Sequence, residues 1–255
     1  GKELRPDVTV TVDGKTLTDE DFTLSYSSNK KPGTATVTIE GKGFYKGTVA
    51  QTFTIKENPD LHRSDLNRSI RISMSGSKVN VKWSKVDIAE GYDVFLAKCG
   101  SSFSKKPALS TKKTSIAVSK ISGKKVSSSE NYKALVKAYR MIDGKKHYIT
   151  SSEIVHVAGT KSKKYTNPSK ITGIPDAKTL KTGKTYTIKG NVKKANSKKA
   201  LLPAKHAKVL RYNTSDRTVA TVTNKGVIKA AGKGTCKVYA VTLNGVSRYI
   251  TVTVK

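Results

Sequence analysis

The sequence predicts an all-β protein made of three tandem antiparallel modules in an elongated row, of which the second and third are immunoglobulin-like or fibronectin type III-like β-sandwiches. Three observations support this fold class: apolar residues alternate with polar ones along most of the chain, Gly recurs with Asp or Asn between these stretches, and no uninterrupted amphipathic helix is present. Strict alternation is typical of half-buried antiparallel strands. Many short strands separated by turns favour sandwiches over βαβ units.

The alternating segments run from one end of the chain to the other. They are "DVTVTVDG", "TATVTIEG", "AQTFTI", "KVNVKW", "YDVFLA", "RTVATVTN" and "RYITVTV". Tight hairpins are predicted at Asp13-Gly14, Asp143-Gly144 and Asn244-Gly245, because such pairs accept positive φ. The best helical candidate, "KANSKKALLPAKHAKVL", is interrupted by Pro203, which a helix interior does not accommodate.

Charge divides the 255 residues into three parts. Residues 1–57 carry eight Lys and Arg against eight Asp and Glu, residues 58–160 carry 19 against 8, and residues 161–255 carry 22 against 2. The net charges are therefore 0, +11 and +20, which give the total of +31. This asymmetry predicts separate modules and a C-terminal part that attracts polyanions. No run approaches 18 apolar residues and no signal peptide is evident. The strand-like ends suggest a fragment of a larger chain, and this fragment is expected to be monomeric.

One stretch near the C-terminus, "NKGVIKAAGKGTCK", is close to a phosphate-binding loop. The motif G-x-x-x-x-G-K-[ST] has four residues between its glycines, but five separate Gly226 from Gly232, and Gly234 occupies the Ser/Thr position. A P-loop also needs a helix after it, whereas strand-like sequence lies on both sides here. The stretch is therefore predicted to be a short "VIKA" strand between turns. The glycines of "GKGFYKG" fail as a dinucleotide motif for the same reason, so no cofactor is expected.

The first module contains the pattern G-T-A-x-V-T-I-x-G-x-G-x-Y-x-G-T from Gly33 to Thr48, within "VTVDGKTLTDEDFTLSYSSNKKPGTATVTIEGKGFYKGTVAQTFTI". Residues 1–57 thereby resemble a small all-β repeat that is common in surface proteins of Gram-positive gut bacteria. Such repeats usually begin with a short Tyr-containing strand, which is missing here. The resemblance implies an extracellular location.

The second module contains "VNVKWSKVDIAEGYDVFLAK" and "NYKALVKAYRMIDGKKHYITSSEIVHV". From about residue 63 to residue 158 the chain resembles a bacterial fibronectin type III domain, with Trp83 on strand B, the G-Y-x-V of strand C, and strands F and G in the second segment. Along that segment, Tyr132, Ala134, Val136 and Ala138 are expected to face inward, and Lys133, Lys137 and Arg140 outward. The predicted core is Trp83, Tyr92, Leu96, Tyr132 and Val136.

The third module contains "LKTGKTYTIKGNV" and "YNTSDRTVATVTNKGVIKAAGKGTCKVYAV". From about residue 169 to residue 255 it resembles a group-two bacterial immunoglobulin-like domain, with Tyr212 in place of the common Trp. The insertion "KKANSKKALLPAKHAK" is longer and more basic than usual. The predicted domains are thus 1–57, 58–160 and 161–255, joined by the short linkers "KENPDLHRSD" and "GTKSKKYTNPSK".

No catalytic or metal-binding constellation is predicted. Cys99 and Cys236 fall in separate modules, which argues against a disulfide, and Cys236 alternates with inward-facing apolar residues. A nucleophilic cysteine needs a nearby His and an orienting group, and nothing ties His206 to Cys236. Zinc-ligand spacings are absent among the histidines and cysteines. The four histidines are His62, His147, His156 and His206.

The acidic residues give no stronger signal. Asp19, Glu20 and Asp21 form the only acidic cluster, but without the alternating spacing of a calcium loop, which favours a solvated turn. Cross-links between Lys and Asn beside a buried acid have no identifying motif, and the third module has only Asp176 and Asp216 to assist one. No metal and no cross-link is therefore predicted.

The basic C-terminal part is the main candidate for a binding function. Its lysines either attract anionic polymers, such as teichoic acids, sulfated or sialylated glycans or anionic membranes, or they serve solubility. Lys greatly outnumbers Arg, which suits diffuse attraction, and no aromatic platform is interleaved with the charges, so no specific nucleic acid partner is expected. The candidate polyanion-binding residues are Lys161, Lys163, Lys164, Lys193, Lys194, Lys198, Lys199, Lys205 and Lys208, with Lys170 beside them.

The predicted function is a non-catalytic stalk and adhesion region of a bacterial cell-surface or cell-wall protein, which presents a cationic surface to anionic wall polymers or host glycans. Two alternatives remain open. The chain is an accessory region of a large secreted glycoside hydrolase or peptidase, which the sequence before Gly1 would reveal, or it is a carbohydrate-binding module. Since Trp83 is predicted to be in a core, sugar stacking would fall to a tyrosine. The candidates are Tyr26, Tyr45, Tyr165, Tyr239 and Tyr249.

Overall fold

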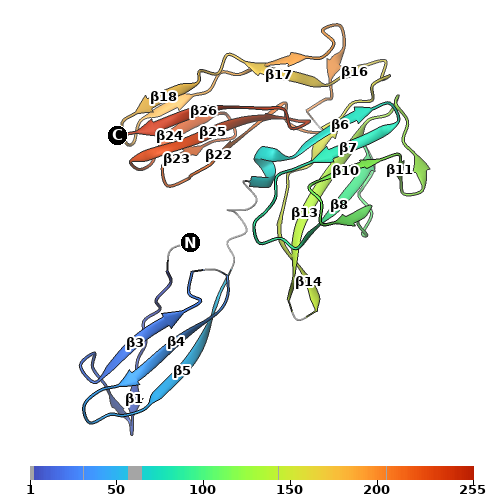
Figure 1. Cartoon of the computed structure of the whole chain (residues 1–255). Helices are drawn as coiled ribbons and strands as arrows, with labels where there is room; N and C mark the ends of the chain where they lie inside the picture. Colours follow the sequence, from blue (N-terminus) through green and yellow to red (C-terminus); the bar gives the residue numbers. More distant parts are fainter. Residues whose placement is uncertain (1–2, 31, 57–64, 143, 205) are drawn as a thin grey trace. The chain divides into compact units, whose positions relative to one another are not determined.

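The computed structural model describes residues 3–30, 32–56, 65–142, 144–204 and 206–255. The chain forms two compact units, Gly1–Asn58 and Pro59–Lys255 (Figure 1). Strands dominate both units, and residues 65–69 are the only helical turn in the described part of the chain. The predicted all-β fold is therefore confirmed. The predicted linker "KENPDLHRSD" and the boundary at residues 57 and 58 lie almost entirely outside the described residues.

The first unit is a small antiparallel structure. A three-stranded sheet has the order β3-β4-β5, and a two-stranded hairpin, β1 with β2, precedes it. Asp13 and Gly14 have φ values of 48° and 80°, so the predicted tight turn joins β1 to β2. The strands are β1 (Thr11–Val12), β2 (Lys15–Thr16), β3 (Phe22–Ser27), β4 (Gly33–Gly41) and β5 (Thr48–Ile55).

The second unit begins with a β-sandwich over residues 65–158, called here the middle sandwich. One sheet has the order β10-β7-β6, and the other has the order β14-β13-β8-β9 with β15 also paired to β13. The strands are β6 (Arg71–Ser75), β7 (Lys78–Lys82), β8 (Gly91–Lys98), β9 (Leu109–Thr111), β10 (Ser115–Val118), β13 (Tyr132–Ile142), β14 (Lys145–Ser151) and β15 (Val155–Val157), and the short hairpin of β11 (Lys120–Ile121) and β12 (Lys124–Lys125) lies beside them.

The core of the middle sandwich contains every residue predicted for it. Trp83, Tyr92, Leu96, Tyr132 and Val136 are all buried in one apolar cluster. The Trp83 and Tyr92 rings meet edge to face at 5.3 Å, and the Tyr92 hydroxyl accepts a hydrogen bond from the Val86 amide at 2.8 Å. The predicted alternation along β13 is also confirmed, because Ala134 and Ala138 are buried while Lys133 and Lys137 are not.

The remaining residues, 159–255, form the C-terminal sandwich. One sheet has the order β18-β26-β25-β22 and the other the order β19-β24-β23, while β17 pairs with β20 and β16 pairs with β21. The strands are β16 (Tyr165–Thr166), β17 (Pro168–Thr172), β18 (Ala177–Leu180), β19 (Thr185–Thr187), β20 (Asn191–Lys194), β21 (Ala200–Leu201), β22 (Leu210–Thr214), β23 (Ala220–Val222), β24 (Val227–Ala230), β25 (Gly234–Thr242) and β26 (Ser247–Val254).

The stretch that resembles a phosphate-binding loop is a strand between turns, as predicted. The "VIKA" residues are β24, and β23 and β25 lie before and after it. Gly226 has a φ of 79° and its Cα faces the Tyr212 ring, where a Cβ would lie 2.8 Å from a ring carbon. Cys236, Val238 and Ala240 are buried, so the inward set predicted along β25 is confirmed.

The segment "GTKSKKYTNPSK" is more than the linker that was predicted, since it contains β16 and most of β17. It is held because the Asn167 side chain exchanges two hydrogen bonds with the Ala158 backbone, at 2.8 and 2.9 Å. Its strands then pair with β20 and β21, which satisfies the backbone groups that a free linker would leave to water.

The two sandwiches of the second unit contact each other directly. The His156 amide donates to the Leu243 carbonyl at 2.8 Å, and the Ile72 amide donates to the Asn244 carbonyl at 3.0 Å. A small apolar cluster of Ala158, Leu202 and Leu243 fills the contact. The Asn244-Gly245 turn that makes these bonds is wider than the two-residue hairpin predicted, since only Gly245 has positive φ and the Thr242 amide bonds to Val246.

Candidate functional site

The candidate polyanion-binding lysines of the insertion lie on β20 and the turn after it. Lys193 and Lys194 are exposed on β20, and Lys198 is exposed in the turn. Lys199 is half-buried, and its Nζ donates to the Ser162 carbonyl at 2.5 Å. Lys199 therefore holds two segments together, while the other three ammonium groups remain open to solvent.

Pairing of β16 with β21 brings the second group of lysines next to the first. The two strands are parallel, with Tyr165 opposite Ala200. Lys161, Lys163 and Lys164 are exposed on the segment that leads into β16. Lys170, on β17, lies directly opposite Lys193 on β20. Like charges in such cross-strand positions repel each other, which a bound polyanion would relieve.

We call this surface the lysine patch, and its exposed members are Lys161, Lys163, Lys164, Lys170, Lys193, Lys194 and Lys198. Lys208 is not part of it, because it lines a cavity between the two sandwiches. Lys205 lies outside the described residues. The two acids of this sandwich are engaged elsewhere: Asp176 bonds to Arg248 at 2.9 Å, and Asp216 accepts hydrogen bonds from Thr218.

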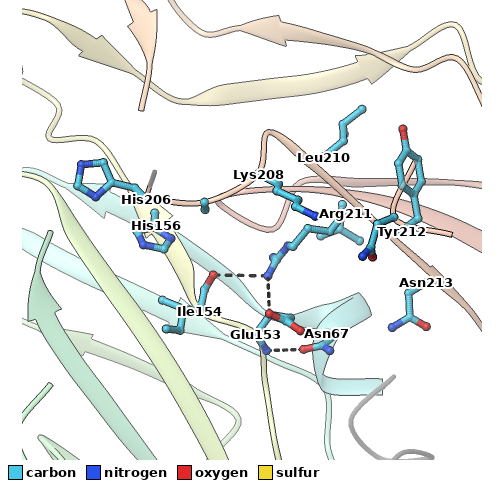
Figure 2. A pocket seen from close by; sticks show the side chains of 13 residues that line it. Asn67, Glu153, Ile154, His156, His206, Lys208, Leu210, Arg211, Tyr212 and Asn213 are labelled. Atoms are coloured by element: carbon cyan, nitrogen blue, oxygen red, sulfur yellow. Dashed lines mark hydrogen bonds and ion pairs between the residues drawn. The ribbon is translucent and has the colours of Figure 1, made fainter. Parts of the chain in front are cut away.

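The cavity, called here the junction cavity, has a volume of about 490 Å³ (Figure 2). The middle sandwich contributes the residues around β15, among them Glu153, Ile154 and His156. The C-terminal sandwich contributes β22, with Arg211 and Asn213, and the segment before it. The cavity exists because the outer side of β22 approaches the end of the middle sandwich, as the direct hydrogen bond from Arg68 to the Thr214 carbonyl also shows.

Arg211 is the charged group at the centre of this cavity. Its Nη1 donates to the Ile154 carbonyl at 3.4 Å and lies 3.9 Å from Oε2 of Glu153. Its Nε and Nη2 are buried and have no hydrogen-bond partner among the described residues. Burial lowers the pKa of the Arg211 guanidinium, and the Glu153 charge opposes that shift. Arginine nevertheless remains charged, so two donors of a cation are left unsatisfied.

His156 adds a second buried polar group to the cavity wall. It is only 4% exposed, its Nδ1 has no hydrogen-bond partner among the described residues, and its ring lies 6.2 Å from that of His206. Burial, together with the nearby charges of His206, Lys133 and Arg211, lowers the pKa of His156 to about 4. The imidazole is therefore neutral in the folded protein at neutral pH.

The stability of the second unit is expected to fall on acidification below about pH 6.5. The folded-state pKa of His156 lies below its unfolded value, so the unfolded chain binds the proton first and the stability present above pH 6.5 is lost towards pH 4. Each pKa unit corresponds to about 1.4 kcal/mol, which gives a loss of about 2–3 kcal/mol. Urea unfolding across this pH range should show that the free energy of unfolding depends less on pH in His156→Gln than in the wild type. In His147→Gln, whose side chain is exposed, this pH dependence should be that of the wild type. The same pH dependence in both variants would contradict the assignment of the stability loss to His156.

Among the described residues, the cysteines are not grouped with the histidines. Burial raises the pKa of the Cys99 thiol to about 11 and also raises that of Cys236, to which Thr214 Oγ1 donates at 3.7 Å. His206 lies beside His156 rather than Cys236. His62 is outside the described residues. Within the described ranges, no three His, Cys, Asp or Glu side chains are grouped for metal binding. The acidic cluster is a turn, where Asp21 accepts two hydrogen bonds from Thr18.

On the middle sandwich, outside the basic C-terminal part, aromatic rings lie among lysines. On the outer face of β8, β13 and β14, the Lys137 ammonium lies 5.1 Å from the Phe95 ring and 4.8 Å from the Tyr148 ring. The buried Asp93 carboxylate bonds to Lys146, Tyr148 and Ser110 on the same face. Period-two alternation puts these residues on one face, so the pattern was already present in the sequence.

The five candidate tyrosines for sugar stacking are scattered. Tyr239 and Tyr249 form the one close pair among them in the described part of the chain, with ring centroids 5.5 Å apart. Lys237 lies 4.5 Å from the Tyr249 ring, and Arg68 lies 5.4 Å from the Tyr239 ring. Tyr26 bonds to the Pro6 carbonyl in the first unit, Tyr165 is covered by Lys164, and Tyr45 lies in the loop after β4.

The sequence matches no protein-family model and no curated protein. Among solved structures, it is similar to the insect immune protein hemolin, whose domain arrangement was described with implications for homophilic adhesion (TM-score 0.22, 12% identity, 96% of this chain and 65% of that chain). It is also similar to three N-terminal domains of the highly immunogenic outer capsid protein of bacteriophage RB49 (TM-score 0.23, 10% identity, 94% of this chain and 91% of that chain). A third similar structure is that of domains EC1–3 of mouse protocadherin-24 (TM-score 0.23, 14% identity, 100% of this chain and 92% of that chain). The chain thus spans 65% of the length of the hemolin chain that it matches.

In the described part of the chain, no helix has the length and the apolar character that crossing a membrane requires.

Proposed function

We propose that this chain is a non-catalytic, extracellular stalk and adhesion region of a bacterial cell-surface protein, and that the lysine patch of its C-terminal sandwich binds anionic wall polymers or host glycans. The location follows from the resemblance of the three modules to bacterial surface repeats. The partner follows from the charge, which is +20 over residues 161–255.

The observation that carries this proposal is the proximity of two lysine-bearing segments that are separate in the sequence. The β16–β21 and β17–β20 pairings bring the segment that carries Lys161, Lys163 and Lys164 next to the segment that carries Lys193 and Lys194. A solubilising surface needs no such clustering, since dispersed charges of both signs serve that purpose.

The binding expected of this surface is diffuse. The ammonium groups of the patch are exposed and stand on flexible stems, so they attract negative charge without fixing the orientation of the partner. Exposed charges are screened over about 8–10 Å at physiological ionic strength. Affinity should therefore grow with the length and charge density of the polymer, and it should decrease strongly with salt.

Replacing Lys193, Lys194 and Lys198 with Gln is expected to weaken binding to teichoic acid or heparin by roughly 10- to 100-fold at low salt, at about 0.5–1 kcal/mol for each lost cation. The melting temperature should not change, because all three side chains are exposed and none makes a side-chain hydrogen bond or ion pair given by the structure. Lys199 is kept, since its bond to Ser162 is structural.

The matched control replaces Lys181, Lys184 and Lys225 with Gln. These lysines are also exposed and belong to the same sandwich but not to the patch, so the net charge change is identical. If both triple variants lose affinity equally, net charge alone explains binding and the patch is not a site. Binding that is unaffected in the patch variant would remove the proposal.

A further inference from the structure

We propose that the junction cavity binds the carboxylate group of an acidic sugar residue, and that Arg211 is the residue that holds it. This site differs from the lysine patch in place and in kind, because it is a single, partly open cavity with a directional donor. The proposal therefore does not depend on the binding of polymers by the patch.

The first argument is the geometry of the unused guanidinium edge. Nη1 of Arg211 is occupied by the Ile154 carbonyl and faces Glu153. Nε and Nη2, which remain without partners, share the other side of the planar group. Their two N–H bonds run parallel and match the two oxygens of one carboxylate, the bidentate geometry that arginine favours.

The second argument is energetic. Buried donors without an acceptor cost about 1–3 kcal/mol each, and more when the group is charged. Arg211 side-chain exposure is 18%, so bulk water compensates only a part of this cost. A ligand carboxylate that enters the cavity would satisfy both nitrogens in a poorly solvated place, where a charge-assisted hydrogen bond is strong.

The third argument concerns the rest of the cavity wall. Asn213 and Asn224 bring amide groups that both donate and accept hydrogen bonds, which suits a ligand rich in hydroxyl groups. Leu210 and Ile154 supply apolar surface. A volume of about 490 Å³ lies in the range of small-molecule sites and has room for one sugar residue. Figure 2 shows Arg211 with Ile154, Leu210 and Asn213 among the residues that line the cavity.

The direct test is an NMR titration of the intact 255-residue chain with methyl β-D-glucuronide, which carries one carboxylate and no polymeric charge. We expect saturable shifts of the Arg211 side-chain Nε–H signal and of the Asn213 side-chain amide, and we expect them to persist in about 0.3 M NaCl, where diffuse attraction is screened. Methyl β-D-glucoside, which lacks the carboxylate, should cause no such shifts. Inorganic sulfate should compete at least tenfold more weakly than the glucuronide, because it lacks the ring hydroxyls.

The matching variant is Arg211→Lys, which keeps the positive charge but loses the two parallel N–H donors of the guanidinium. It should weaken glucuronide binding at least tenfold. Arg217→Lys, at an exposed position of the same sandwich, is the control and should bind as the wild type does. No shift at about 20 mM glucuronide would overturn the proposal, since that excludes even millimolar affinity. Equal response to the glucoside, equal competition by sulfate, or unchanged binding by Arg211→Lys would also overturn it. The wild-type titration decides the question even if Arg211→Lys fails to fold.

Discussion

Replacing Gly245 with Ala is expected to lower the free energy of unfolding of the second unit by about 3 kcal/mol or more. Gly245 has a φ of 92°, a conformation that a side chain disfavours. The added Cβ would lie 2.0 Å from the Ile70 carbonyl oxygen and 2.7 Å from the Arg71 Cα. Both of these are backbone atoms, so no side-chain rotation relieves the clash, and the two sandwiches must separate locally.

Gly183→Ala separates the two causes of this loss, which are the positive φ and the clash of the added Cβ with backbone atoms. Gly183 has a φ of 81° in the same sandwich, but nothing lies within 4 Å of the position that its Cβ would take. Gly183→Ala should therefore lower the free energy of unfolding only by the cost of placing a side chain at positive φ, about 1 kcal/mol. Calorimetry of both variants measures the difference. Equal losses would mean that the docking of the turn against the middle sandwich contributes nothing to stability.

The same variant tests how the two sandwiches are coupled. The Asn244 side chain donates to the Pro168 carbonyl and its backbone carbonyl accepts from Ile72, so the Gly245 turn links the start of the C-terminal sandwich to β6. If these contacts make unfolding cooperative, the second unit should unfold in one transition in the wild type and in two transitions in Gly245→Ala. The coupling matters for a stalk, because a contact of this kind transmits force without a flexible hinge.

The strand pattern and the cores were predictable because they depend on local alternation. Ala134 and Val136 are buried and Lys133 and Lys137 are not, which follows directly from the period of two along β13. The "VIKA" strand was predictable for the same reason. Its flanking glycines are needed for backbone geometry, and no phosphate is required to explain them.

The junction was not predictable, because its residues look like ordinary turn residues. The sequence pattern predicts a hairpin turn at Asn244-Gly245 and a linker around Asn167, yet both positions make hydrogen bonds that join the two sandwiches. Arg211 lies on an outward-facing position of β22, where alternation predicts exposure to solvent. Its burial comes from the middle sandwich, where its partner Ile154 lies 57 residues away in the sequence, and no local pattern reports this contact. The lysine patch was predicted as a group, while the pairing that assembles it, β16 with β21, was not.

The second large effect is expected for Trp83→Ala, which should lower the free energy of unfolding by about 3–5 kcal/mol. Trp83 is 5% exposed and packs edge to face on Tyr92, so truncation leaves a cavity between the two sheets of the middle sandwich. The indole Nε1 has no hydrogen-bond partner among the described residues, so the ring contributes through packing and area alone. Urea unfolding followed by circular dichroism measures the loss without depending on the fluorescence of this residue.

Trp83→Phe distinguishes packing from polarity at this position. Phenylalanine keeps an aromatic edge against Tyr92 and removes a buried N–H that has no acceptor, so part of the lost contact area is offset by the lost desolvation cost. The expected decrease is about 1–2 kcal/mol, less than half of that for alanine. A phenylalanine variant as unstable as the alanine variant would show that Nε1 has a partner in solution. The indole N–H would then donate to a buried water, so the interior of the middle sandwich would contain water despite its apolar residues.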